Sequence, residues 1–474
     1  MRKYRVFGAI DGFAARIRGR VRASRGVRFL FRMDTRMSES RWLGCVKSVL
    51  RCVVHRCRRF FVRRGLDGKI VGQFRVFSAV LSVVLLLCLP FLSLLPSPTI
   101  TLTLYVIVVE LLWLVTVLTD DCSLGFGAVD VGLLLVVLSV FFSGLFGAGG
   151  KNGFFHAIVT CALLLFWFPM RDLFCRSPWG DRAALALKCA CVFAALWGIF
   201  EYFSGKAVLR WVDLSRFSDI GGRVCGPFSN PNIFAVFLVA TAPLFLAGAV
   251  EMTSRFWRIF HLLSFGVCLL CLVLTWSRGG WLALLVATAC FFLLHSMRTM
   301  KCLLLGLLPL GIGACFLPHS VTNRFLSIGS LSESSINYRF LTWRGVLSMI
   351  RAHPLGIGAG NDAFAAVYPT YAVSGTERTV HTHALFLQIL AEQGIPGLLI
   401  FLFFLTLLAL SFVRIRMTAR TGQATREAAF CGIVGVLTMG LFDYVWYHPG
   451  MLFLFFTLAA LIPANEDSFL ESFF

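Results

Sequence analysis

The chain has 474 residues, of which 58% are hydrophobic and only 14% are charged, and its mean hydropathy is +0.82. A water-soluble protein of this length could not bury so much apolar surface, so composition excludes a soluble fold. Repeated apolar runs of about 18 or more residues are typical of transmembrane helices. We therefore predict an all-α, polytopic integral membrane protein.

The formal net charge of +21 is concentrated in one segment. Residues 1–75 hold 21 Lys and Arg against four acidic residues, so the other 399 residues are nearly neutral. We expect a basic arm on the cytoplasmic membrane surface, where each basic residue near anionic lipid contributes about 1 kcal/mol. Nucleic-acid binding is the alternative that such a segment raises, but its place directly before the first span favours membrane lipids.

Twelve apolar spans follow the arm. They cover roughly 76–95, 100–119, 129–147, 154–170, 184–203, 230–250, 260–276, 280–297, 301–318, 384–413, 427–446 and 449–464. The tenth exceeds one membrane crossing, so we expect it to begin with a short re-entrant or interfacial helix before Pro396. The predicted organisation is the arm 1–75, nine helices over 76–318, a loop at 319–383, three helices over 384–464 and a tail at 465–474.

Basic residues in the short loops predict the orientation of the spans. The loops after the even-numbered spans are rich in Lys and Arg, which favours a cytoplasmic position for them and for the N-terminus. Segments 204–229, 277–280 and 319–383 then face outward, although they also carry arginines. These are Arg210, Arg216, Arg223, Arg278, Arg324, Arg339, Arg344, Arg351 and Arg378. Because a guanidinium binds phosphate oxygens in pairs, we expect an anionic ligand on that face.

The 16 cysteines are scattered, and most of them lie inside apolar runs. None has the spacing of a zinc site, and no CxxC pair stands beside a histidine cluster. A small buried hydrophobic residue is the better interpretation for most of them. The sequence therefore predicts neither a metal site nor a disulfide framework.

Four segments of the outer face carry candidate chemistry. In the first, GGRVCGPFSNPN, Arg223 precedes Asn230 and Asn232, and Asn followed by Pro is typical of a helix N-terminus. In the second, LTWSRGGW, two glycines after Arg278 predict a tight turn that holds the arginine in place. Snorkelling to the interface is the plainer alternative, but the cost of a charge in the membrane favours function.

The third segment is a predicted amphipathic helix at 338–352, which carries Arg339 and Arg344. The GIGAG sequence after it is weak as a phosphate loop, because no strand and helix frame it. The fourth segment, HTHALFLQILAEQGIPG, has His381 and His383 at the start of a hydrophobic span. Polar groups there are costly, so we expect them to serve function.

The order of these motifs resembles one family. SRGGW comes first, then Arg339 four residues before Trp343, then HPLGIGAGNDAF, then a histidine followed by LQILAEQGIPGLL. This combination over roughly 220–410 resembles the O-antigen ligase and O-antigen polymerase superfamily of bacterial envelope glycosyltransferases. The resemblance implies a metal-independent, inverting transfer without cofactors at the outer face of the cytoplasmic membrane. The donor would be a glycan on a polyprenyl diphosphate, and the acceptor a hydroxyl on a glycan, a lipid or a protein.

The resemblance also assigns residues. The family's histidine falls on His383 and its arginines on Arg278 and Arg339, which we predict to be catalytic. The predicted substrate-binding residues are Arg223, Asn230, Asn232, Arg344 and His381. The family usually has Asn after its histidine, where this chain has Ala384, so His381 stays an alternative. The expected chemistry is consistent with these assignments. Fixed arginine cations can stabilise the charge that develops on a diphosphate leaving group, and a histidine can accept the proton of the acceptor hydroxyl.

Several alternatives stay open. Ligase and polymerase share donor chemistry, and a protein-directed oligosaccharide ligase is a third branch. A flippase for lipid-linked glycans belongs to another class, and it would need charges deep in several spans and often an internal repeat. The sequence has neither. Asp443 is expected either to line the cavity or to pair with an arginine, and Glu392 either to position His383 or to cap a helix.

Overall fold

The computed structural model describes residues 68–119, 126–174, 178–209, 222–295, 334–418 and 423–462, with five helical residues between 44 and 59. The rest of the arm, the expected span 301–318 and the tail 465–474 lie outside the described residues. So do Arg210, Arg216 and Arg324.

Within the described ranges the regular elements are all helices, apart from one isolated bridge between Val208 and Arg223. The α-helices are α4 (Gly68–Cys88), α5 (Pro98–Thr119), α6 (Ala128–Phe146), α7 (Gly150–Leu165), α8 (Trp167–Phe174), α9 (Trp179–Phe203), α10 (Pro231–Thr241), α11 (Pro243–Glu251), α12 (Arg255–Leu274), α13 (Arg278–His295), α16 (Ser334–Ala352), α17 (Asn361–Val367), α18 (Leu385–Thr418), α19 (Gln423–Gly440) and α20 (Pro449–Ala460). Short 3-10 helices are η1 (Leu89–Leu94), η3 (Gly226–Phe228), η4 (Tyr368–Thr370) and η5 (Val445–Tyr447).

Nine helical stretches in the described ranges are long and apolar enough to cross a membrane. They confirm the predicted all-α, polytopic membrane protein and match nine of the twelve expected spans. The eleventh and twelfth expected spans correspond to α19 and α20, which are shorter than predicted. Gly440 ends α19 and Pro449 begins α20, so residues 441–448 form a connection instead of helix ends.

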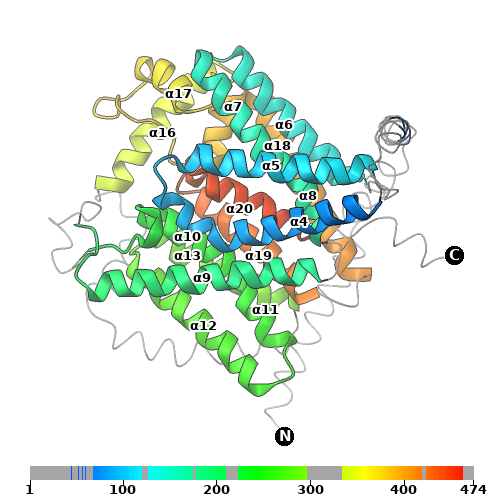
Figure 1. Cartoon of the computed structure of the whole chain (residues 1–474). Coiled ribbons are helices and arrows are strands. Elements are labelled where there is room, and N and C mark those ends of the chain that lie inside the picture. Colours follow the sequence, from blue (N-terminus) through cyan, green and yellow to red (C-terminus); the bar gives the residue numbers. More distant parts are fainter. Residues whose placement is uncertain are drawn as a thin grey trace, which may run out of the picture.

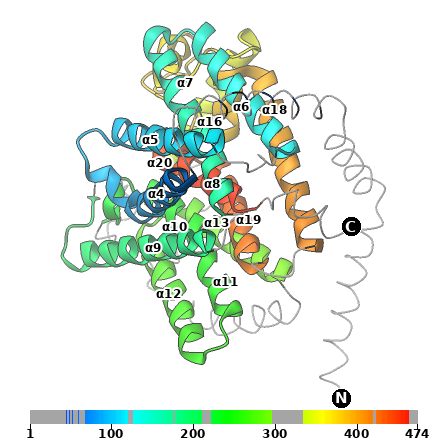
Figure 2. The same cartoon turned by 45° about the vertical axis from the view of Figure 1, so that its right-hand side comes forward.

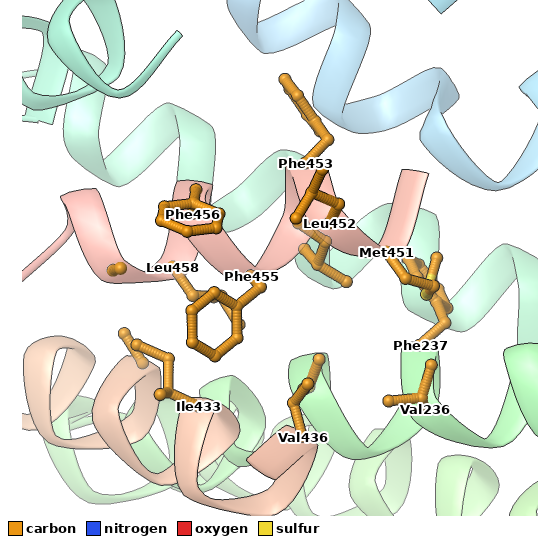
Figure 3. Close-up of a cluster of buried hydrophobic side chains, with 14 of the residues drawn as sticks. Val236, Phe237, Ile433, Val436, Met451, Leu452, Phe453, Phe455, Phe456 and Leu458 are labelled. Atoms are coloured by element: carbon orange, nitrogen blue, oxygen red, sulfur yellow. The ribbon is translucent and has the colours of Figure 1, made fainter. Parts of the chain in front are cut away.

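The core of the bundle surrounds α20. This helix has no polar face, and every residue from Gly450 to Ala460 is buried, as expected for a helix that is hydrophobic all round. Both views show it near the centre of the bundle (Figures 1 and 2), where it contacts α5, α7, α8, α10 and α19. Phe455 faces Ile433 and Val436 of α19 (Figure 3). Phe453 packs on Phe166 with ring centroids 5.0 Å apart.

Helix α18 is broken near its start, as the sequence predicts. Gly394 has φ 69° and ψ −171°, two residues before Pro396, so a short helix precedes the long span. A Cβ on Gly394 would lie 2.3 Å from the carbonyl carbon of Leu355, and one on Gly356 would lie 2.5 Å from the Glu392 oxygen. The glycines of the GIGAG loop and of the break thus let two backbones meet, which accounts for that motif without a phosphate.

The segment 334–383 lies over one end of the bundle, at the left of Figure 1. Helix α16 confirms the expected helix at 338–352 and starts four residues earlier. A second hydrophobic cluster holds this segment to the start of α18. It contains Val346, Met349, Ile350, Ile357, Phe364, Tyr368 and Ala391. A small core of its own therefore fixes α16 beside the first turns of α18.

Candidate functional site

Asp443 is the centre of a polar network at the end of the bundle covered by segment 334–383. Its N–H, like that of Phe442, donates to the Met439 carbonyl, so the chain turns tightly after α19. The residue is only 7% exposed. Side chains from the start of α10, from α16 and from the residues before α18 converge on its carboxylate.

Four donors surround the Asp443 carboxylate. It accepts hydrogen bonds from Asn232 Nδ2 at 2.8 Å and from the Tyr444 backbone N–H at 2.9 Å. Arg339 Nη2 lies 3.6 Å from Oδ2, and His383 Nδ1 lies 3.8 Å from Oδ1. Burial alone would raise the pKa of Asp443, but the charge of Arg339 and the contact with His383 outweigh it and hold that pKa well below its usual range. Asp443 is therefore an anion at neutral pH.

Asn232 connects Asp443 with Arg223. Its Oδ1 accepts from Arg223 Nη2 at 2.8 Å, while its Nδ2 donates to Asp443. Arg223 is buried, and its Nε donates to the Thr275 carbonyl at 2.8 Å. Both ends of the Asn232 amide are thus engaged inside the protein, which suits a positioning role.

Asn230 caps α10, as the Asn-Pro sequence predicts. Its Oδ1 accepts from the Asn232 N–H at 2.8 Å, and its Nδ2 donates to the Tyr447 hydroxyl at 2.8 Å. The Tyr447 ring stacks on His381 with centroids 5.3 Å apart and an interplanar angle of 8°. The cap therefore also supports one of the two histidines.

The two histidines differ in their surroundings. Burial and the neighbouring His383 lower the pKa of His381 to about 4, so its ring is neutral at pH 7. Its Nδ1 accepts from the His383 backbone N–H at 3.3 Å. The His383 side chain is 26% exposed, lies next to Asp443 and packs edge-on to Tyr338. Both rings are partly exposed, and His383 is the one whose Nδ1 faces the Asp443 carboxylate.

Arg339 and Trp343 lie four residues apart on α16, and therefore on one face of it. Trp343 Nε1 donates to the Thr382 carbonyl at 2.8 Å, between the two histidines, while Arg339 extends to Asp443. The spacing of this pair is what docks α16 against the histidine segment.

Arg278 begins α13 at the same end of the bundle. The nearest side chain to a Cβ on Gly279 would be Met439 at 3.9 Å, and a Cβ on Gly280 would be 2.9 Å from Ala235. The turn is at residues 275–276, before Arg278, so the two glycines lie in the first turn of α13 and the prediction that they form a tight turn is wrong. Gly280 lets α13 pack closely on α10, and Gly279 lies next to the end of α19. Arg278 is half-buried, and the neighbouring Gly279 lies beside Met439, whose carbonyl accepts from the Asp443 N–H.

Three residues other than glycine have a left-handed backbone in the described ranges: Ser229 (φ 56°), Trp276 (φ 54°) and His383 (φ 53°). Each costs of order 1 kcal/mol or more and persists only where the surrounding structure holds it. They lie in three of the four segments that the sequence singles out. Such strain clusters at functional sites.

Arg344 is the one predicted site residue in the described ranges that the structure puts apart from this network. It is exposed on α16, and its position five residues after Arg339 turns it to another side of the helix. The other seven lie in the network or, for Arg278, beside it.

The expectation that Asp443 pairs with an arginine is confirmed, because Arg339 Nη2 lies 3.6 Å from its Oδ2. Sequence reasoning did not predict that Asp443 is the centre of the network, and it gave no role to Glu201. Asp443 had a signal, since it is the only acidic residue between Glu427 and Glu466. Glu201 Oε2 accepts from the Gly226 N–H at 2.7 Å, and the carboxylate also accepts from the Cys225 N–H. It holds the loop after Arg223. No group of three or more potential metal ligands occurs within the ranges described.

Comparison with protein families gives one match. Residues 263–402 match a family model described as O-antigen ligase. The matched segment begins in α12 and ends within α18, and it contains Arg278, Arg339 and His383. No match is found among curated proteins.

Proposed function

We propose that this protein transfers a glycan from a lipid carrier to an acceptor. The match of residues 263–402 to the O-antigen ligase family supports this proposal. The donor is a glycan on a polyprenyl diphosphate. The acceptor is a hydroxyl on a glycan, a lipid or a protein, and the product belongs to the bacterial cell surface. The reaction proceeds on the extracytoplasmic face of the cytoplasmic membrane, because the short-loop charges orient the site outward.

The arginines stabilise the leaving group. As the anomeric carbon separates from the diphosphate oxygen, negative charge grows on the diphosphate, and preorganised cations lower the free energy of that transition state. Arg339 is held 3.6 Å from Asp443 and is 24% exposed, so it can turn toward a ligand. Arg278, at the start of α13, supplies a second cation.

His383 takes the proton in this mechanism. The acceptor oxygen attacks the anomeric carbon while the bond to the diphosphate breaks, and the hydroxyl proton passes to His383 Nε2. Asp443, 3.8 Å from Nδ1, orients the ring and stabilises its charged form. A single displacement inverts the anomeric centre, and the proposed chemistry uses neither metal nor cofactor.

One observation carries this proposal: Asp443 brings Arg339, His383 and Asn232 together from three separate segments of the chain. These residues are a cation, a titratable base and a positioning amide, the set that transfer from a diphosphate needs. Asn232 and Asp443 are 211 residues apart in the chain, so their meeting results from the fold.

Single replacements test the assignment. Purified His383→Ala, Arg278→Ala and Arg339→Ala should each lose at least about 100-fold in transfer from a polyprenyl-diphosphate glycan. Arg351→Ala is the matched control, because Arg351 is exposed on the same helix as Arg339. Near-normal rates in all three folded variants would refute the catalytic roles. Loss of activity in His381→Ala but not in His383→Ala would move the base to His381.

A further inference from the structure

Thr382, between the two histidines, is fully buried, and each of its polar groups has a partner. Its N–H donates to Gln388 Oε1 at 2.8 Å, and its carbonyl accepts from Trp343 Nε1 at 2.8 Å. Its hydroxyl donates to the Ala384 carbonyl at 2.7 Å and accepts from the Ala384 N–H at 3.2 Å. These bonds fix the peptide on which the left-handed His383 depends.

Gln388 can hold Thr382 only in one orientation of its amide. Oε1 must face the Thr382 N–H, so Nε2 must find an acceptor on the opposite side. That acceptor is Glu392 Oε1, at 2.8 Å. In the flipped amide, Nε2 would face the Thr382 N–H and Oε1 would face the Glu392 oxygen, so neither hydrogen bond could form.

Glu392 is itself anchored to the scaffold. The residue is only 7% exposed. Its backbone carbonyl accepts from Ser143 Oγ at 2.7 Å and from the Gly358 N–H at 3.1 Å, just before the break in α18. A buried carboxylate costs several kcal/mol to desolvate, so packing alone would favour an apolar side chain here.

We propose that Glu392 is a positioning residue for His383, acting through Gln388 and Thr382. The Glu392 oxygen that accepts from Nε2 fixes the orientation of the Gln388 amide, and the amide holds the Thr382 peptide. The peptide keeps His383 in the left-handed conformation that brings Nδ1 to Asp443. Glu392 touches no reacting atom in this scheme. The activity readout of this inference rests on the proposed function.

The first test compares two neighbours on α18. Glu392→Leu should lower kcat about 10- to 100-fold and leave KM for the donor within about threefold, because misplacing a base slows the chemical step while the arginines still hold the diphosphate. Glu392→Gln should lose less, about three- to tenfold. Gln393→Ala is the control, since it removes only the bond from Ser139 Oγ and should keep normal rates. A normal kcat in both Glu392 variants would overturn the proposal.

A double-mutant cycle tests whether Glu392 and Gln388 act as one unit. Gln388→Leu should resemble Glu392→Leu, and the double variant should lose no more activity than either single variant. If the two losses multiply, Glu392 does not act through Gln388 and the relay is wrong. Glu392→Gln is nearly isosteric, so it carries the test should the leucine variants fail to fold.

A second readout is independent of transfer. The rate at which diethyl pyrocarbonate modifies His383, followed by mass spectrometry, should change at least about threefold in Glu392→Leu or Glu392→Gln and stay constant in Gln393→Ala. An unchanged rate overturns the positioning role even in an active enzyme. A changed rate in a protein without any transferase activity would leave this inference standing and refute the proposed function instead.

Discussion

Glu427 lies near the start of α19 and Asp443 lies three residues after its end, so about 20 Å of helix separates them. Each carboxylate faces one arginine and one histidine, so by residue type the two clusters are alike. At the first, Glu427 accepts from Arg416 Nε at 2.9 Å and contacts His295 Nδ1 at 2.8 Å, and Gln423 adds a third bond at 3.0 Å. The polar groups of that cluster are hydrogen-bonded to one another, and they join α13, α18 and α19.

The cluster at Asp443 is looser. Its arginine and histidine lie 3.6 and 3.8 Å away, beyond ordinary hydrogen-bond length, and only Asn232 and a backbone N–H bind it directly. Exposure does not distinguish the clusters, since Arg339 and His383 are 24% and 26% exposed and Arg416 and His295 are 27% and 26% exposed. Distance does. Arg339 and His383 point at Asp443 without a short hydrogen bond to it, so they can still bind a ligand. Arg416 and His295 are hydrogen-bonded to Glu427 and hold helices together.

Asp443→Asn should produce the largest effect that this comparison predicts. The amide fits the same space and can still accept from Asn232, but it removes the charge that aligns Arg339 and stabilises protonated His383. We expect kcat/KM for glycan transfer to fall on the order of 10²- to 10³-fold. The same measurement on Glu427→Gln should differ from the unmodified protein by less than about threefold. Equal activity losses in the two variants would remove the distinction between the clusters.

Glu427→Ala should affect stability instead. Removing the carboxylate leaves Arg416 and His295 without their shared partner, and breaking such a buried pair costs about 3 kcal/mol or more. Thermal unfolding in detergent measures this loss. Asp443→Ala is the control and should lower the melting temperature less, because fewer direct bonds are broken. The reverse order of melting temperatures would contradict the assignment of Glu427 as structural.

The site end of the bundle should also lose stability in acid. Burial lowers the pKa of His381 to about 4, and burial likewise lowers that of His448 to about 4, against about 6.5 in an unfolded chain. The unfolded chain therefore binds protons first as pH falls. Stability is full above pH 6.5 and decreases between pH 6.5 and 4, by roughly 1–2 kcal/mol for His381.

Melting temperatures at pH 7.5, 6 and 4.5 measure this dependence. His381→Asn should flatten the decrease, and replacing His448 as well should flatten it further. A slope that neither replacement changes would mean that other groups cause the acid sensitivity.

Much of the helical plan could be predicted from the sequence, because the length of an apolar run and the period of an amphipathic helix are local properties. The gathering of Arg278, Arg339 and His383 at one end followed from counting spans and loop charges. What could not be predicted depends on contacts between distant residues. Asn232 and Asp443 are 211 residues apart, and no local pattern distinguishes Asp443 from Glu427. The GIGAG loop proved to be a close backbone contact, which only Gly394 and the fold explain.

The smallest expected effect concerns two arginines on α16. Arg344 and Arg351 are both exposed, and their spacing of seven residues puts them on the same side of the helix, about 10 Å apart along its axis. Arg344 lies nearer to Arg339, so a donor or acceptor glycan that extends from the site meets it first. Arg344→Ala should therefore raise KM about two- to fivefold with kcat unchanged, while Arg351→Ala should leave both constants as they are. Since solvation and helix face are matched, a difference between the two variants reports distance from the bound glycan. Equal effects would instead mean that these arginines act only as diffuse surface charge, and raising the ionic strength would then abolish both.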